Sequence, residues 1–287
     1  MEQPPLFIIS SGRAGSTIFH RILCEHPSVS WLTALADKYP GRPGLQRKFM
    51  GAVDIPVAGR VFSKIYPEEC YTFWEYLVPG FRRPCRDLRD DDVTVRNANR
   101  VREALRSIPT VSRPLLSLKL TGWPRIGMLN EIFPDARFIH VIRDGRAVAN
   151  SFLAVPWWLG WGGPEKWRWG PLSQEHLLEW EENDRSFVAL AAIQWKIYLN
   201  AYESSIKSIA PERLLEVRYE DLCNQNEEVF STVLDFCNLE NSNRFTQALA
   251  KFKLHSEDAK WRRDLKPHQQ AILEQSLEAN LRKYNYT

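Results

Sequence analysis

Residues 7–17 constrain the fold more strongly than any other part of the chain, and they read FIISSGRAGST. A short apolar segment leads through a loop of small residues into the start of a helix. The apolar segment does not alternate with polar residues, which is typical of strands buried on both faces of a parallel sheet. Small side chains in the loop let backbone N–H groups approach an anion, and the helix N-terminus adds partial positive charge. The stretch therefore predicts an α/β fold with an anion-binding turn after its first strand.

Three side chains of this loop are suited to contact the anion directly. Ser16 and Thr17 carry hydroxyls that can donate to phosphate oxygens, and Arg13 can add charge-assisted hydrogen bonds. We predict a phosphate-binding loop made of Gly12, Arg13, Ala14, Gly15, Ser16 and Thr17. The alternative is a strand–helix turn that is capped by a Ser and binds no ligand. The loop departs from ordinary nucleoside triphosphate loops, because no Lys precedes the hydroxyl pair.

Four short apolar segments carry the pattern of buried strands. They are Leu6–Ser10, Leu115–Leu120, Arg137–Ile142 and Leu214–Arg218. Helical spacing of apolar residues covers Thr17–His26, Gly145–Leu153 and Arg185–Ser208. Strands that alternate with helices in this way predict a three-layer α/β fold, in which helices flank a parallel sheet.

Two stretches interrupt this alternation. Residues 38–95 are rich in Pro, Gly and Arg without a clear period, and residues 155–182 hold several tryptophans among glycines and prolines. These tryptophans are Trp157, Trp158, Trp161, Trp167, Trp169 and Trp180. They are expected to form a small core, to line a ligand pocket or its lid, or both. Because no flexible linker brackets either stretch, we expect a single domain over residues 1–287 with two insertions beside the site.

The composition excludes several classes of protein. The 38 Lys and Arg residues against 35 Asp and Glu leave a net charge of +3, which is too small for a broad footprint on duplex nucleic acid. The 5 cysteines form no CxxC pair, so we expect neither a zinc site nor a disulfide framework, but reduced thiols. No apolar run reaches the length of a membrane span. We expect a cytoplasmic protein that binds no nucleic acid, and no motif indicates an oligomeric state.

A second anion site is expected at the end of the third predicted strand. Arg143 follows that strand at its carboxyl end, where ligands of open α/β sheets bind. Ser151 lies on the helix that follows, so the two side chains can bracket a phosphate together. His140, inside the same strand, is expected to be a packed or hydrogen-bonded core residue.

The acidic residues near these strand ends favour a site without a metal. Enzymes that clamp Mg²⁺ against phosphates need an acidic residue beside the ion. Asp144 is explained more simply as an acid in the first turn of a helix. Glu220 and Asp221, after the fourth strand, remain as residues that could hold a metal. We therefore predict a site that binds phosphates and contains no metal.

These motifs resemble those of the sulfotransferases that use 3′-phosphoadenosine 5′-phosphosulfate (PAPS). Residues 12–17 are similar to the 5′-phosphosulfate loop of that family, in which Arg13 stands where the cytosolic branch has Lys and the tyrosylprotein branch has Arg. Arg143 and Ser151, with Arg-Asp-Gly-Arg starting the intervening stretch, resemble the family's 3′-phosphate motif at its usual spacing.

Two further segments complete the resemblance. Tyr219, within the run Arg-Tyr-Glu-Asp-Leu, matches a tyrosine that faces the nucleotide in the family. Lys260, Trp261 and Arg262 resemble the C-terminal Lys-Trp-Arg run of bacterial members, close to the nucleotide lid. The four motifs occur in the family's order over residues 6–265, and the tryptophan-rich stretch also resembles bacterial members.

The resemblance implies both an activity and a fold. It implies transfer of the sulfuryl group of PAPS, as co-substrate, to a hydroxyl of a small-molecule acceptor, on a P-loop nucleotide-binding fold whose parallel sheet is flanked by helices. Binding of the 3′-phosphate would distinguish PAPS from ATP. Lys119 occupies the place of a catalytic Lys in the family, and Arg13 would share its role of stabilising charge on the transferred group. A solvent-facing position at the strand end is the alternative for Lys119.

The general base that the acceptor hydroxyl requires is not identified by the resemblance. The cytosolic branch has a His where this chain has Thr121, and the tyrosylprotein branch has a Glu where residues 33–36 read TALA. Asp37, Glu175 and His176 are candidates, each equally well explained as an exposed surface residue. Two rival functions stay open: a nucleotide kinase with a degenerate phosphate loop, and a nucleotide-binding protein without activity.

Overall fold

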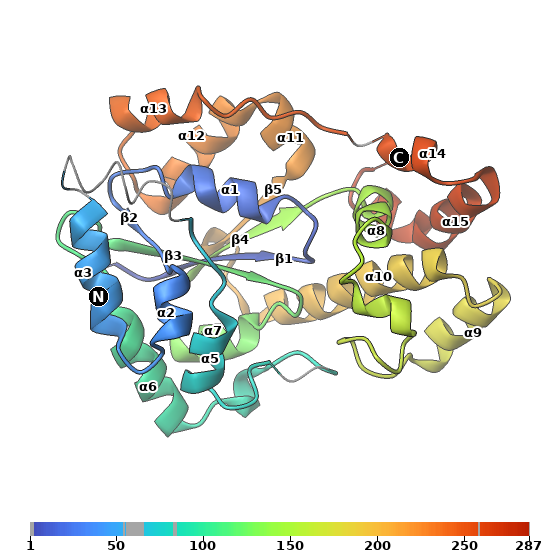
Figure 1. The fold of residues 1–287 in the computed structure, drawn as a ribbon, viewed down its shortest axis with the longest axis horizontal. Coiled ribbons are helices and arrows are strands. Elements are labelled where there is room, and N and C mark those ends of the chain that lie inside the picture. Colours follow the sequence, from blue (N-terminus) through green and yellow to red (C-terminus); the bar gives the residue numbers. More distant parts are fainter. Residues whose placement is uncertain (1–2, 54, 56–65, 83–84, 258, 287) are drawn as a thin grey trace.

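The structure, a computed structural model, describes residues 3–53, 55, 66–82, 85–257 and 259–286. At its centre lies a 5-stranded sheet in the order β2-β3-β1-β4-β5. The strands are β1 (Leu6–Ser10), β2 (Val29–Ser30), β3 (Leu115–Thr121), β4 (Arg137–Ile142) and β5 (Leu214–Arg218). Neighbouring strands pair in parallel, and helices flank both faces of the sheet (Figure 1). The predicted three-layer α/β fold is confirmed, and each predicted strand is present.

The central strand β1 shows why the apolar segments do not alternate with polar residues. All of its residues are buried, and adjacent side chains of a strand point to opposite faces of the sheet. Phe7 and Ile9 belong to one hydrophobic core, whereas Leu6 and Ile8 belong to the other. Burying a side chain of this size stabilises the fold by about 1.5–3 kcal/mol. Both sets must therefore be apolar.

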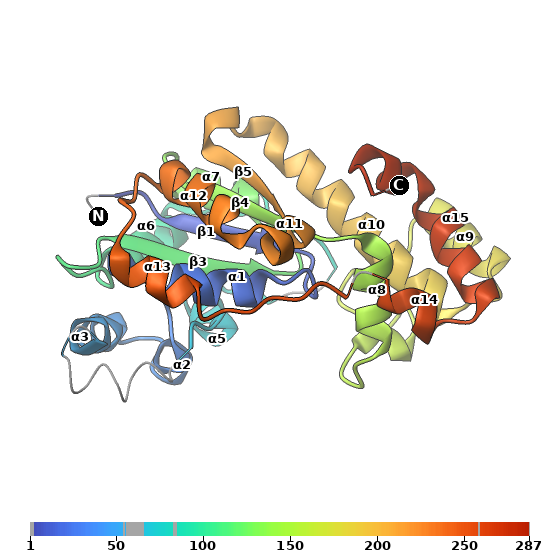
Figure 2. The same cartoon turned by 90° about the horizontal axis from the view of Figure 1, so that it is seen from above.

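One layer of helices covers the face that carries Leu6 and Ile8 (Figure 2). It contains α1 (Ser16–Leu23), α11 (Tyr219–Asn224), α12 (Asn226–Cys237) and α13 (Asn243–Leu249). Phe19 of α1 stacks on Phe230 of α12 with the ring centroids 5.3 Å apart. This packing fixes α1 against the sheet and so fixes the loop that precedes it.

A larger set of helices covers the opposite face. It contains α5 (Tyr71–Leu77), α6 (Val95–Arg106), α7 (Ile126–Ile132), α8 (Gly145–Leu153), α10 (Phe187–Ser205) and α15 (Pro267–Lys283). The remaining elements are α2 (Ala34–Lys38), α3 (Pro43–Val53), α9 (Gln174–Glu182), α14 (Lys260–Asp264), η1 (Asp90–Asp92), η2 (Leu159–Gly162), η3 (Ile206–Ser208) and η4 (Pro211–Arg213). In both views α8, α9, α14 and α15 stand together beyond the carboxyl ends of the strands (Figures 1 and 2). Within the described residues, no helix has the length and hydrophobicity that a membrane span requires.

The first insertion is more regular than its sequence indicates. Although residues 38–95 show no clear period, they include α3, α5 and η1, while 54, 56–65 and 83–84 lie outside the described residues. Trp74 and Phe81 from this stretch stack with their ring centroids 5.0 Å apart, and both are buried in the same hydrophobic core as Phe7. Aromatic side chains rather than a long helical repeat anchor the insertion, which is why no period was visible.

The pairing register brings three strand ends to one edge of the sheet. Ser10 of β1 is level with Thr121 of β3, and Ile9 of β1 is level with His140 of β4. The backbone N–H of Gly122 also donates to the carbonyl oxygen of Ser10 at 3.1 Å. The loop after β1, the end of β3 and Arg143 after β4 therefore lie together.

Candidate active site

The loop after β1 leaves the N-terminus of α1 open. Gly15 is the N-cap of α1 in a left-handed conformation, and no side chain forms a capping hydrogen bond. The first N–H groups of a helix have no partner within it, so those of α1 are directed at the loop. The turn is therefore not the Ser-capped alternative, and its backbone can bind an anion.

Tyr219 explains why residue 15 is a glycine. A Cβ atom at Gly15 would lie 2.1 Å from Cδ2 of Tyr219, and the φ of +84° also disfavours any side chain there. The guanidinium of Arg143 lies 4.4 Å from the centroid of the same ring. The structure thus brings Tyr219 and Arg143 together at the loop, as their motifs predict.

The hydroxyls of the loop are held by the strands beneath them. The Ser10 hydroxyl donates to Oγ of the buried Ser16 at 2.7 Å, and Lys119 Nζ donates to Oγ1 of Thr17 at 2.8 Å. Because both loop hydroxyls accept these bonds, their own hydrogens can point to a ligand. The Ala14 side chain is buried in the core and anchors the loop from below.

Arg13 joins the two predicted anion motifs into one site. Its Nε donates to Oγ of Ser151 at 2.9 Å, and a guanidinium nitrogen of Arg143 donates to the carbonyl oxygen of Arg13 at 3.4 Å. Burial, and then the charge of Arg143, lower the pKa of the Arg13 guanidinium from its usual value. Two guanidinium groups held this close repel each other, and an anion between them would relieve that repulsion.

Lys119 does not face solvent, so that alternative is wrong. Its side chain is 6% exposed, and Nζ lies 2.8 Å from Oε1 of Glu69 in addition to its bond to Thr17. A buried ammonium requires such partners, because an unpaired charge in the interior is costly. Lys119 therefore links the phosphate loop to a carboxylate that the sequence-based analysis did not identify.

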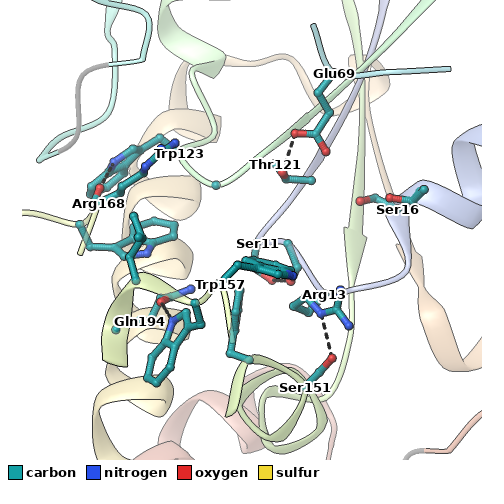
Figure 3. A pocket seen from close by; sticks show the side chains of 18 of the residues that line it. Ser11, Arg13, Ser16, Glu69, Thr121, Trp123, Ser151, Trp157, Arg168 and Gln194 are labelled. Atoms are coloured by element: carbon teal, nitrogen blue, oxygen red, sulfur yellow. Dashed lines mark hydrogen bonds between the residues drawn. The ribbon is translucent and has the colours of Figure 1, made fainter. Parts of the chain in front are cut away.

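Glu69, which precedes α5, packs against the end of β3, where Lys119 and Thr121 lie. The Thr121 hydroxyl donates to Oε2 of Glu69 at 2.8 Å (Figure 3), while the Tyr71 hydroxyl donates to the Thr121 carbonyl at 2.6 Å. Burial first, and then the charge of Glu69, raise the pKa of Tyr71 to about 12. The only sequence signal for this carboxylate is the pair Glu68-Glu69 directly before an aromatic segment.

A cavity of about 770 Å³ opens beside these residues. The phosphate loop, Arg143 and Ser151 line one end, and Glu69 and Thr121 line the wall. The indoles of Trp123, Trp158, Trp167 and Trp169 also line the cavity, with Trp123 on the side away from the loop (Figure 3). Trp157 instead lies beside the loop, where the guanidinium of Arg13 is 5.7 Å from its ring centroid. Trp158, Trp167 and Trp169 are also buried in the main core. Trp158, Trp167 and Trp169 therefore belong to a core and line the cavity at once, whereas Trp161 and Trp180 do not line it. A role in an acceptor pocket or lid stays a prediction.

The three base candidates named from the sequence do not line this cavity, although Asp37 lines the neighbouring one with Lys119 and Thr17. Asp37 accepts a hydrogen bond from the backbone N–H of Phe73 at 2.9 Å and lines a neighbouring cavity that also contains Glu69. Glu175 and His176 lie on α9 and do not line the larger cavity. Burial lowers the pKa of His176, and Lys196 adds to this effect. Glu69, by contrast, contacts Lys119 and lines both cavities together with Thr17.

The predicted C-terminal run does not reach the cavity. Trp261 is buried, and the guanidinium groups of Arg146 and Arg262 lie 5.0 and 4.9 Å from its ring centroid. Lys260 pairs with Glu257 at 3.6 Å, on the exterior. Contacts of Lys260, Trp261 and Arg262 with a nucleotide therefore remain a prediction.

The acids after β4 and β5 have structural partners. Asp144 is the N-cap of α8 and accepts from the backbone N–H of Arg146 at 2.8 Å, which fits its expected role at a helix start. Glu220 accepts from the backbone N–H of Asp144 at 3.0 Å and from the Tyr286 hydroxyl at 3.1 Å. Among the described residues, no group of three or more His, Cys, Asp or Glu side chains is arranged to hold a metal.

His140 is a core residue, as expected. It is fully buried, its Nδ1 lies 2.9 Å from Oε2 of Glu216, and its ring stacks on Tyr202. Burial lowers its pKa from the usual value.

The fold and the loop define a class: parallel α/β proteins with a phosphate-loop turn after the first strand. A family model described as the sulfotransferase family matches residues 4–243. The chain belongs to the sulfotransferase family, so the resemblance seen in its motifs is confirmed. No curated protein matches the sequence.

Solved structures of sulfotransferases share the fold. STF9 from Mycobacterium avium is 16% identical over 96% of this chain and 76% of its own, with a TM-score of 0.57. The sulfotransferase domain of the Synechococcus PCC 7002 olefin synthase is 20% identical over 96% of this chain and 94% of its own, with a TM-score of 0.52. The corresponding domain of the curacin biosynthetic pathway is 17% identical over 95% and 97%, with a TM-score of 0.52. At these identities the likeness establishes the architecture, and it confirms the predicted P-loop type of fold.

Proposed function

We propose that this sulfotransferase transfers the sulfuryl group of PAPS to a hydroxyl of a small-molecule acceptor by metal-independent in-line displacement. The observation that carries the proposal is the contact between the two anion motifs, in which Arg13 bonds Ser151 and Arg143 bonds the Arg13 backbone. A nucleotide with phosphates at both its 3′ and 5′ positions would offset the charge of both guanidinium groups.

Each end of the nucleotide has a binding group in this proposal. The open N-terminus of α1 and the hydroxyls of Ser16 and Thr17 bind the 5′-phosphosulfate, because helix N-termini favour anions. Arg143 and Ser151 bind the 3′-phosphate, and the ring of Tyr219 lies against the nucleotide. Lys260, Trp261 and Arg262 would contact the nucleotide only from outside the cavity. We also propose that the protein is cytoplasmic.

The chemistry follows from the position of Lys119 and Glu69. Glu69 takes the proton from the acceptor hydroxyl, and the acceptor oxygen attacks sulfur as the bond from sulfur to the bridging oxygen breaks. The bisphosphate product (PAP) leaves with that bridging oxygen. Charge builds on this oxygen, as in phosphoryl transfer, and Lys119 and Arg13 stabilise it. Lys119 Nζ, 2.8 Å from both Glu69 and Thr17, reaches the base and the loop alike.

The test is transfer of radiolabelled sulfur from PAPS to a panel of hydroxyl acceptors, with and without EDTA. We expect labelled product at a rate that EDTA does not change, because Arg13 and Lys119 supply the positive charge. Phosphate transfer from ATP that is lost in EDTA and restored by Mg²⁺ would establish the kinase instead. PAP binding without transfer or PAPS hydrolysis would identify a nucleotide-binding protein without activity.

A further inference from the structure

The end of the cavity opposite the phosphate loop combines flat apolar surfaces with an arginine. Trp123 and Trp169 lie with their ring centroids 4.8 Å apart, and Trp123 Nε1 donates to the carbonyl oxygen of Arg168 at 3.0 Å. Figure 3 shows Arg168 beside Trp123, across Trp157 from Arg13. The indole of Trp123 therefore fixes the backbone of Arg168, an exposed residue that lines the cavity.

The charges along the cavity wall are unbalanced. Among its described lining residues, the acid is Glu69, while the cations are Arg13, Arg21, Arg82, Arg125, Arg143 and Arg168. Glu69 is already paired with Lys119. In the proposed function Arg13 and Arg143 bind nucleotide phosphates, so the remaining arginines exceed what the nucleotide needs. An excess of one sign of charge in a cleft attracts a ligand of the opposite sign.

Arg125 is the buried member of this group, and its guanidinium lies 4.4 Å from the ring centroid of Phe81. Its side chain is 5% exposed and donates only to carbonyl oxygens, those of Trp123 at 2.7 Å and Phe81 at 3.3 Å. Its Nε has no hydrogen-bond partner among the described residues. The carboxylate of Asp87 accepts from its backbone N–H at 2.7 Å rather than from its guanidinium. The charge of Arg125 opposes the rise in the pKa of Asp87, so that carboxylate already offsets part of it. The net excess of positive charge along the cavity therefore comes from the other arginines.

We infer that the acceptor carries a carboxylate on an aromatic body that also bears the reacting hydroxyl. The indoles of Trp123 and Trp169 contact the ring, and Arg168 binds the carboxylate. Guanidinium and carboxylate groups match in plane and charge, and indoles stack on flat rings. This inference rests on the proposed function, because it uses the same cavity and leaves Glu69 for the hydroxyl.

Matched pairs of ligands test the inference by binding alone. The purified protein, with and without PAP, is titrated with 4-hydroxyphenylacetate and 4-hydroxyphenylacetamide, and with 3-(4-hydroxyphenyl)propionate and its amide, while tryptophan fluorescence is followed. We expect each acid to bind about tenfold or more tightly than its amide, as a charged hydrogen bond allows. Arg168→Gln should remove this preference without weakening the binding of the amides.

Arg185→Gln is the control, because Arg185 is a surface residue paired with Glu181 and lies outside the cavity. It should leave the preference unchanged. Equal affinity for acids and amides, or no binding of any acid, overturns the inference even when PAP binds normally. Failure of PAP to bind would overturn the proposed function instead, while the titration without PAP would still report the preference for acids.

Discussion

The two ends of the cavity are lined by different kinds of chemical group. The phosphate end consists of backbone N–H groups, short hydroxyls and arginines that follow β1 and β4. The opposite end consists of indoles and long arginine side chains from segments outside the sheet. Groups on strand and helix ends are held more rigidly than groups on loops. The difference suggests a fixed site for the shared nucleotide and a separately variable site for the acceptor.

The two ends meet at Glu69 and Thr121, and Lys119 contacts Glu69 from the neighbouring cavity. Lys119 and Thr121 belong to the sheet, whereas Glu69 comes from the first insertion and is held there by both of them. The reacting groups would therefore lie where the rigid end joins the variable one. Substitutions at this junction should affect turnover, and substitutions at either end should affect the binding of one ligand.

The largest effect is expected for Glu69→Gln. If Glu69 is the general base, its loss should lower kcat by about 10²–10⁴ while the affinity for PAP stays the same. Single-turnover transfer from PAPS and calorimetry with PAP measure the two quantities. Glu68→Gln is the matched control, because Glu68 is exposed and its backbone N–H donates to the carbonyl oxygen of Leu32. Unchanged turnover in Glu69→Gln would return the role of base to Asp37 or to a residue not considered.

A somewhat smaller effect is expected for Lys119→Met. Removing one preorganised donor to a developing charge costs about 10²–10³ in kcat, and PAP affinity should change little if Lys119 acts mainly in the transition state. Arg13→Ala provides the contrast, because Arg13 lies within the phosphate loop, so binding and turnover should fall together. Equal losses of affinity in both variants would show that Lys119 only binds the nucleotide. Thermal unfolding of Lys119→Met checks that the unpaired Glu69 leaves the fold intact.

Residues at the phosphate end could be predicted from the sequence, whereas the charged residues at the opposite end could not. Arg143 was identified because it follows a strand of a parallel sheet, whose carboxyl ends meet at one edge. Lys119 was identified through the resemblance to the sulfotransferases, since nothing in its own segment distinguishes it from a strand-end lysine. Glu69 and Arg168 were missed because they lie in insertions without a period, where packing of aromatic side chains decides the position. Trp261 stands between cations in the sequence as a stacking residue would, yet it is buried beneath Arg146.

The third prediction tests how the phosphate end recognises the 3′-phosphate. Arg143→Ala should reduce the preference for PAP over AMP by about tenfold to a hundredfold, since a lost charged hydrogen bond typically costs about 1.5–3 kcal/mol. Calorimetry with both nucleotides gives the ratio of dissociation constants. The control is Arg106→Ala at an exposed position on α6, which should change neither constant. An undiminished preference in Arg143→Ala would remove Arg143 from the 3′-phosphate site.

The smallest expected effect is on the stability of the fold, and it concerns Asp87, which contacts Arg125 at the end of the cavity away from the loop. Burial raises the pKa of Asp87 from 3.8 to about 6, although Asp87 accepts from Arg125, Leu88 and Ser205. A carboxylate whose pKa is higher in the folded state binds more protons there, so its contribution to stability falls as pH rises from about 4 to about 6. The full span corresponds to roughly 3 kcal/mol.

Asp87→Asn should therefore gain stability relative to the wild type between pH 4 and pH 7, by up to about 3 kcal/mol. Its amide keeps the oxygen that accepts from Arg125 and Leu88, and its NH₂ group can donate to Ser205. Urea unfolding at a series of pH values measures the difference. Asp92→Asn is the control: Arg86 lowers the pKa of Asp92 to about 2, so the stability difference of that variant should stay constant above pH 4. A stability difference for Asp87→Asn that does not rise with pH would mean that Arg125 already neutralises Asp87, and the positive charge available to an acceptor would be smaller.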